Sequence, residues 1–118
     1  MANLFREAGI LYGSGSFADK TTTVDTWVDV GVIPVMAMKT KKLVFKGATN
    51  TVEVQVLGSL DSGLTYQATP VIAAFDVAAA ATVVKDETAL WTDLKVQTRP
   101  KVAATHGKLS TNWLMVSW

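Results

Sequence analysis

The sequence contains no cysteine, and this absence removes two ways of stabilising a small domain. Disulfide bridges and thiolate metal centres both need cysteine, so the fold must depend on its apolar core or on neighbouring chains. The single histidine, His106, lies in a loop-like Ala-Thr-His-Gly-Lys sequence. It lacks the companion ligands of a zinc site, and the chain has no Gly-x-Ser-x-Gly motif. We therefore expect a protein that is not an enzyme, with no cofactor and no metal.

An excess of one charge is also missing. Lys and Arg number 11, Asp and Glu number 10, and the formal net charge is +1, which favours neither nucleic acid nor a membrane surface as a partner. The lysines in segment 39–46 are interpreted as a solvated turn that deters edge pairing. No apolar run approaches the length of about 18 residues that a membrane helix needs. The first residues, which include Arg6 and Glu7, do not read as a signal peptide, so we expect synthesis in the cytoplasm without secretion by that route.

What the sequence does contain is alternation with a period of two residues. Val52, Val54 and Val56 share one phase, with polar residues between them, and this pattern is typical of a strand with one wet face. In segment 89–98 the same pattern places Leu90 inward and Trp91 outward. A chain of 118 residues, 49% of them hydrophobic, is long enough for one domain with its own core.

About seven short strands separated by turn signals predict an all-β fold, an antiparallel β-sandwich or jelly-roll-like structure with an extended N-terminal arm. The expected strands lie near 23–33, 41–46, 51–57, 64–74, 82–85, 89–98 and 109–118. We expect the arm to span 1–21 and the sandwich domain to span 22–118.

Large apolar residues near both ends of the chain predict interfaces. In the arm, Leu4, Phe5, Leu11 and Tyr12 flank a Gly-Ser-Gly-Ser stretch, and a disordered tail would not carry them. They pack either on their own domain or on a neighbouring subunit. The last strand carries apolar residues on both phases and ends at Trp118, which predicts that it is covered on both faces, by the opposite sheet and by the arm or a neighbouring subunit.

The stretch Val-Leu-Gly-Ser-Leu-Asp-Ser-Gly-Leu-Thr-Tyr poses a choice between a turn and a binding site. Gly58 and Gly63 can supply unusual φ angles, and Asp61 can bond its own backbone, so we interpret the segment as a turn that sets strand register. The alternative is that Asp61 and its serines bind a sugar or calcium. An aromatic platform formed by Trp27 and Trp91 would serve the same alternative.

This stretch also carries a family resemblance. The segment Lys-Gly-Ala-Thr-Asn-Thr-Val-Glu-Val-Gln-Val-Leu-Gly-Ser-Leu-Asp-Ser-Gly-Leu-Thr-Tyr-Gln resembles a pattern in small β-sandwich proteins of tailed-bacteriophage particles, in which alternating valines run into a Gly-Ser-Leu-Asp-Gly-like turn. The matching positions are Val52, Val54, Val56, Gly58, Ser59, Leu60, Asp61, Gly63 and Tyr66. A similar turn occurs in discoidin-like carbohydrate-binding sandwiches.

The resemblance implies a structural protein of the virion, most closely a capsid decoration or cement protein. Its implied partners are copies of itself, a trimer among the forms considered, and the major capsid protein or other virion proteins. A tail or connector protein would show the same pattern, and a carbohydrate- or ligand-binding module is the alternative from another class.

Overall fold

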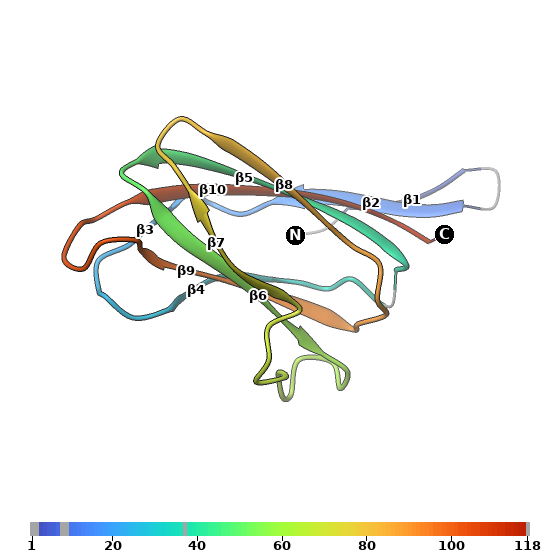
Figure 1. Cartoon of the computed structure of the whole chain (residues 1–118). Helices are drawn as coiled ribbons and strands as arrows, with labels where there is room; N and C mark the ends of the chain where they lie inside the picture. The colour runs from blue at the N-terminus through green and yellow to red at the C-terminus, as the bar shows by residue number, and fades with distance from the viewer. Residues whose placement is uncertain (1–2, 8–9, 37, 118) are drawn as a thin grey trace.

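A computed structural model describes residues 3–7, 10–36 and 38–117, and its elements are ten β-strands (Figure 1). They are β1 (Asn3–Glu7), β2 (Ile10–Ser16), β3 (Lys20–Thr21), β4 (Val28–Ile33), β5 (Thr40–Thr49), β6 (Val52–Ser59), β7 (Ile72–Val77), β8 (Thr82–Glu87), β9 (Asp93–Pro100) and β10 (Lys108–Val116). The described residues form no helix. The expected all-β class is therefore confirmed.

The strands form two antiparallel sheets that pack face to face. The large sheet has the order β1-β2-β10-β5-β8, with β3 also paired to β10, and the small sheet has the order β4-β9-β6-β7. The seven expected strands correspond to β4 through β10. The three further strands, β1 to β3, lie within the first 21 residues, where the backbone pairs with β10.

Three strands begin later than expected, among them the strand predicted at 23–33, which begins at Val28. The strand predicted at 64–74 begins at Ile72, and the strand predicted at 89–98 begins at Asp93. The backbone before each is held by turn hydrogen bonds, such as Gln67 N to Gly58 O at 2.9 Å and Thr92 N to Ser59 O at 2.9 Å. Leu90, expected to face inward, is therefore in a loop.

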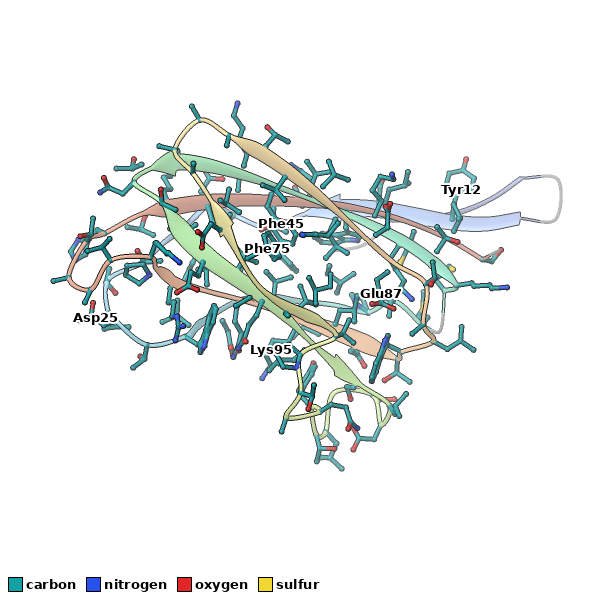
Figure 2. The ribbon with its side chains drawn as sticks, viewed as in Figure 1. Tyr12, Asp25, Phe45, Phe75, Glu87 and Lys95 are labelled. Atoms are coloured by element: carbon teal, nitrogen blue, oxygen red, sulfur yellow. The ribbon has the colours of Figure 1, made fainter. Side chains whose placement is uncertain are left out.

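The core lies between the sheets and follows the period-two pattern closely. Val52, Val54 and Val56 are fully buried, as their alternation predicts. Phe45 of β5 and Phe75 of β7 meet across the two sheets with ring centroids 5.3 Å apart (Figure 2). Apolar burial of this kind is the main contribution to the stability of a chain without disulfides.

An aromatic side chain closes each open side of the sandwich. On one side, Phe75 lies under the Lys85 ammonium, whose Nζ is 4.6 Å from the ring centroid. On the other, Phe17 lies 4.6 Å from the Trp113 ring and occupies the space that a Cβ on Gly31 would need. Any larger residue at position 31 would displace the Phe17 ring.

The N-terminal residues form a hairpin that continues the large sheet. β1 pairs with β2, and β2 pairs with β10 from Ser16↔Asn112 to Tyr12↔Val116. Figure 1 shows the hairpin, in blue, extending past the end of the small sheet. The large sheet therefore continues into a region where no strand of the small sheet lies opposite it.

Candidate assembly interface

The outer face of the small sheet carries a row of hydrogen-bonded polar side chains, beside which Val32 of β4 is 42% exposed. Gln55 of β6 donates to Gln97 of β9 over 2.8 Å, and Gln97 donates to Asp29 of β4 over 2.9 Å. Asp29 also lies 3.8 Å from the Lys95 ammonium. This chain of contacts crosses three neighbouring strands, and each polar group in it has a partner within the protein.

The same face satisfies its longer side chains in the same way. Arg99 Nε lies 3.0 Å from Glu53 Oε1, and the Arg99 guanidinium stacks 4.3 Å from the centroid of the Trp27 ring. Lys95 Nζ lies 4.3 Å from the Tyr66 centroid. The cations therefore cover the aromatic rings, which lowers the apolar surface that this face presents.

The outer face of the large sheet differs, because it carries a line of apolar residues. Leu114 of β10 is 47% exposed and Val84 of β8 is 48% exposed. Val44 of β5 is partly buried between these two strands, and Val116 of β10 and Tyr12 of β2 are partly buried on the far side of Leu114 from Val84. Register and diagonal neighbours connect the five across β8, β5, β10 and β2. We call these five residues the apolar stripe.

A shallow hollow of about 70 Å³ interrupts the stripe near the C-terminal end of β10. It is lined by Thr40, Lys42, Leu114, Met115 and Val116. At its margin the Lys42 ammonium lies 3.1 Å from an Asp86 carboxylate oxygen. The hollow is a concave apolar site with a charged edge, a shape suited to receive an apolar side chain.

The pairing of β10 with β2, and of β2 with β1, places residues of the N-terminal hairpin in line with residues of the stripe. Phe5 of β1 is opposite Tyr12, and Tyr12 is opposite Val116. Leu4 is opposite Gly13, and Leu11 is opposite Arg6. For Leu4, Phe5 and Leu11 the structure describes the backbone, and Trp118 lies outside the described residues.

Within the described chain, the outer face of the last strand is open at Leu114. The inward residues Trp113 and Met115 are 4% and 1% exposed, whereas Leu114 between them is 47% exposed. The reason is geometric, because β2 pairs with the edge of β10 instead of packing on its face. Of the covers predicted for this face, the arm or a neighbouring subunit, the second stays a prediction.

The turn after β6 is organised by one carboxylate and one hydroxyl. Ser59 Oγ donates to Asp61 Oδ1 over 2.7 Å, and the backbone N–H of Gly63 donates to Ser59 Oγ over 2.9 Å. The Thr65 hydroxyl donates to Asp61 Oδ2 over 2.5 Å, and the Thr65 N–H donates to Asp61 Oδ1 over 2.9 Å. These bonds fix the loop without any ligand.

The same bonds determine the acidity of Asp61. Hydrogen bonds from the Thr65 side chain and backbone, and from the Ser59 side chain, lower the pKa of Asp61 to about 2. Both carboxylate oxygens are thereby occupied. Calcium needs six to eight oxygen ligands, and no group of three or more His, Asp or Glu residues in the described chain could hold a metal.

The two glycines of the turn have different roles. Gly63 has a φ of +84°, a conformation that favours glycine. Gly58 does not have the positive φ that we expected, since the described glycines with positive φ include Gly63 and not Gly58. Gly58 instead lies in β6 beneath the Trp91 ring, which a Cβ would approach to 2.4 Å.

The expected aromatic platform is not assembled. Trp91 is partly buried against the core and Gly58, while Trp27 is stacked with Arg99.

His106, in the loop before β10, is exposed, and its carbonyl accepts from Asn50 Nδ2 over 2.6 Å. A hollow of about 110 Å³ beside His106 is lined by small residues and Lys108. Within the described ranges, no helix is long and apolar enough to span a membrane.

Lys41 is the residue that sequence reasoning missed. It belongs to the lysine-rich segment expected to be solvated, yet it is 1% exposed. Its ammonium donates to Met38 O over 2.9 Å and to Ala89 O, and burial lowers its pKa despite the attraction of Glu87. Lys41 therefore ties together the loops before β5 and after β8. Its position in β5 opposite Glu87 carried no local signal of this role.

Comparison with known proteins establishes the fold. No protein-family model matches the chain, and no curated protein matches its sequence. Among solved structures, the SPBc2 prophage-derived protein YomS is 12% identical with a TM-score of 0.61, over 98% of this chain and 100% of that one. A chain of the Bacillus endospore appendages, which are disulfide-linked pili, is 16% identical with a TM-score of 0.55, over 90% of this chain and 87% of that one.

A viral structure shares the same architecture. A chain of the infectious bursal disease virus Gx strain is 13% identical with a TM-score of 0.56, and the match covers 91% of this chain and 32% of the viral chain. The present chain therefore corresponds to about a third of that viral chain. At these identities the similarity is one of fold.

Proposed function

We propose that this protein is a non-enzymatic structural subunit of a phage particle, most closely a capsid decoration or cement protein that associates with copies of itself and with other virion proteins. The observation that carries the proposal is the difference between the two outer faces. The small sheet presents a row of paired polar side chains with Val32 exposed beside it, and the large sheet presents the apolar stripe, which crosses four strands and continues towards a projecting hairpin.

The stripe indicates an interaction site because its residues are neighbours. Single exposed apolar residues are normal on protein surfaces, but a connected apolar patch marks an interaction site. Leu114 and Val84 are the most exposed residues of such a patch. A partner that covers it would give β10 the second apolar neighbour that its sequence pattern calls for.

Three of the proteins that share the fold support this proposal by analogy, although the fold also occurs in proteins such as tripeptidyl peptidase 2. One is derived from a prophage, one belongs to a pilus and one belongs to a virus. The pilus and the virus are both assemblies of many protein chains. A fold that recurs in such settings is compatible with a structural role, while the assignment to this chain depends on its own surface.

The carbohydrate-binding alternative receives no comparable support. The Asp61 carboxylate is engaged by its own loop, and Arg99 covers the Trp27 ring. A sugar site needs exposed aromatic faces and unsatisfied polar groups. Those features would have to be created by rearrangement of contacts that already satisfy one another.

The experiment is sedimentation velocity of the full chain over a range of concentrations. We expect a reversible oligomer, with Leu114→Lys at least about tenfold weaker in association because it places a charge in the apolar contact. Gln55→Lys, on the outer face of the small sheet, is the matched control and should associate like the wild type. A wild-type chain that stays monomeric throughout, or two variants with equal effects, would contradict the proposal.

A further inference from the structure

Three loops at one end of the sandwich are bonded to each other through Thr92. Its N–H donates to Ser59 O over 2.9 Å, its carbonyl accepts from Met36 N over 3.0 Å, and its hydroxyl accepts from Ser62 N over 2.9 Å. Lys41 adds a second connection, between the loop that joins β4 to β5 and the loop that joins β8 to β9, because its ammonium donates to Met38 O and Ala89 O. The loops are thus held in one arrangement before any partner arrives, which lowers the entropic cost of binding.

These tied loops present large apolar side chains to solvent. Leu64 is 83% exposed, Leu60 is 62% exposed and Leu90 is 60% exposed, with Met36 at 48%. Figure 1 shows the loop between β6 and β7 standing away from the body of the sandwich. We call these four residues the leucine tip. Exposed leucines on a rigid loop are unusual for a solvated turn, which is ordinarily polar.

The surroundings of the leucine tip are acidic. Asp61 lies in the loop between β6 and β7, and the Asp93 carboxylate lies beside Gly63 of that loop. Burial and the charges of Asp93, Asp29 and Asp61 raise the pKa of Tyr66. Lys95 is the cation beside the Tyr66 ring and lies 3.8 Å from an Asp29 carboxylate oxygen, so Asp61 and Asp93 remain as the acidic groups of this loop end.

The hollow in the apolar stripe has the complementary character. Its lining includes the exposed Leu114, and its volume of about 70 Å³ suits the branched end of one leucine. Lys42 and Lys46 flank Val44 along β5 and are both exposed, with Asp86 paired to Lys42. This face therefore offers an apolar recess whose margin carries the ion pair of Lys42 and Asp86.

We propose that the leucine tip of one copy docks on the apolar stripe of the next copy, with Leu64 seated in the hollow beside Leu114. The inference rests on the proposed function and identifies the leucine tip as the surface that covers the apolar stripe. The contact joins two different patches, so it is heterologous, and repetition closes a ring or extends a filament. Packing two stripes against each other would leave both hollows unfilled.

The absence of native cysteine gives a direct test. Leu64→Cys and Leu114→Cys proteins are oxidised separately and as a mixture, and covalent dimers are separated by mass. We expect dimers in the mixture and few in either protein by itself. Leu64→Cys mixed with Gln55→Cys is the control and should give none, because Gln55 lies on the other outer face.

Each other outcome overturns the inference and separates it from the proposed function. Dimers of Leu114→Cys by itself would show two stripes in contact, which keeps the proposed function and rejects the leucine tip. No dimers in any sample, with an oligomer still seen by sedimentation, would also reject the tip. A monomer throughout would reject both. In addition, Leu64→Ser should weaken association about tenfold and leave the thermal unfolding of the monomer unchanged, since the side chain is exposed.

Discussion

On the outer face of the small sheet, Gln55, Gln97 and Asp29 bond to one another in a row, whereas on the outer face of the large sheet Leu114 and Val84 have about half of their surface in contact with solvent. Both faces belong to antiparallel sheets that share one core. The two faces therefore differ in how favourable it would be for a protein partner to cover them. A surface of mutually paired polar groups gains little from a protein partner, while an apolar stripe gains the burial of its area.

The comparison also explains the pattern of β10. Its inward residues Trp113 and Met115 fill the core, and its outward residues Leu114 and Val116 repeat the apolar character on the other phase. In β6 the outward residues are Glu53, Gln55 and Leu57. Two strands with buried inner faces thus differ in the outer face, where the proposed assembly would act.

The largest expected effect separates the two phases of β10. Trp113→Ala should lower the unfolding free energy of the monomer by about 3–5 kcal/mol, because it leaves a cavity in the core. Leu114→Ala should change it by less than about 0.5 kcal/mol and act on association instead. Urea unfolding at concentrations where the chain is monomeric measures both. Similar losses for the two variants would mean that Leu114 is part of the core and would break the comparison.

A smaller effect is expected on the polar face. Glu53→Ala removes the contact of 3.0 Å with Arg99, whose side chain is 37% exposed, and should cost about 0.2–1 kcal/mol of unfolding free energy. The loss should shrink as salt is added, and the association constant should stay at the wild-type value. A Glu53→Ala chain with weakened association would place the small sheet in the interface.

The smallest effect is local and depends on pH. Because folding lowers the pKa of Asp61 from 3.8 to about 2, the ionised carboxylate stabilises the loop above the unfolded value, and this contribution is lost as pH falls from about 4 towards 2. Amide exchange at Thr65 should accelerate over that interval, measured by NMR against the amides of Val44 and Val84. Asp61→Asn should show no such pH dependence. A Thr65 amide that is insensitive to acid would contradict the assignment of Asp61.

The sequence predicted the parts of the fold that local pattern controls. The alternation of Val52, Val54 and Val56 predicts a strand with a buried phase, and the structure buries all three. The same alternation failed at Leu90, where hydrogen bonds from Thr92 to a distant loop end the regular pairing. Periodicity gives the phase of a strand, and long-range hydrogen bonds determine where the strand begins.

Features of the candidate interface were harder to predict for a physical reason. Lys41 reads as solvated because its neighbours are lysines, and its burial depends on carbonyls at Met38 and Ala89 that the fold brings near. The exposure of Leu114 depends on β2 pairing at the edge of β10. An apolar residue on the outward phase of a strand predicts that another surface packs on it. The sequence pattern does not say whether that surface belongs to the same chain.

The central claim is that the outer face of the large sheet is buried between subunits and that the outer face of the small sheet is not. Thiol labelling of Leu114→Cys and Gln55→Cys tests it most directly, since the chain has no other cysteine. With rising protein concentration, the labelling rate at position 114 should fall in proportion to the assembled fraction, while the rate at position 55 stays constant. Equal rates at both positions throughout assembly would contradict the account.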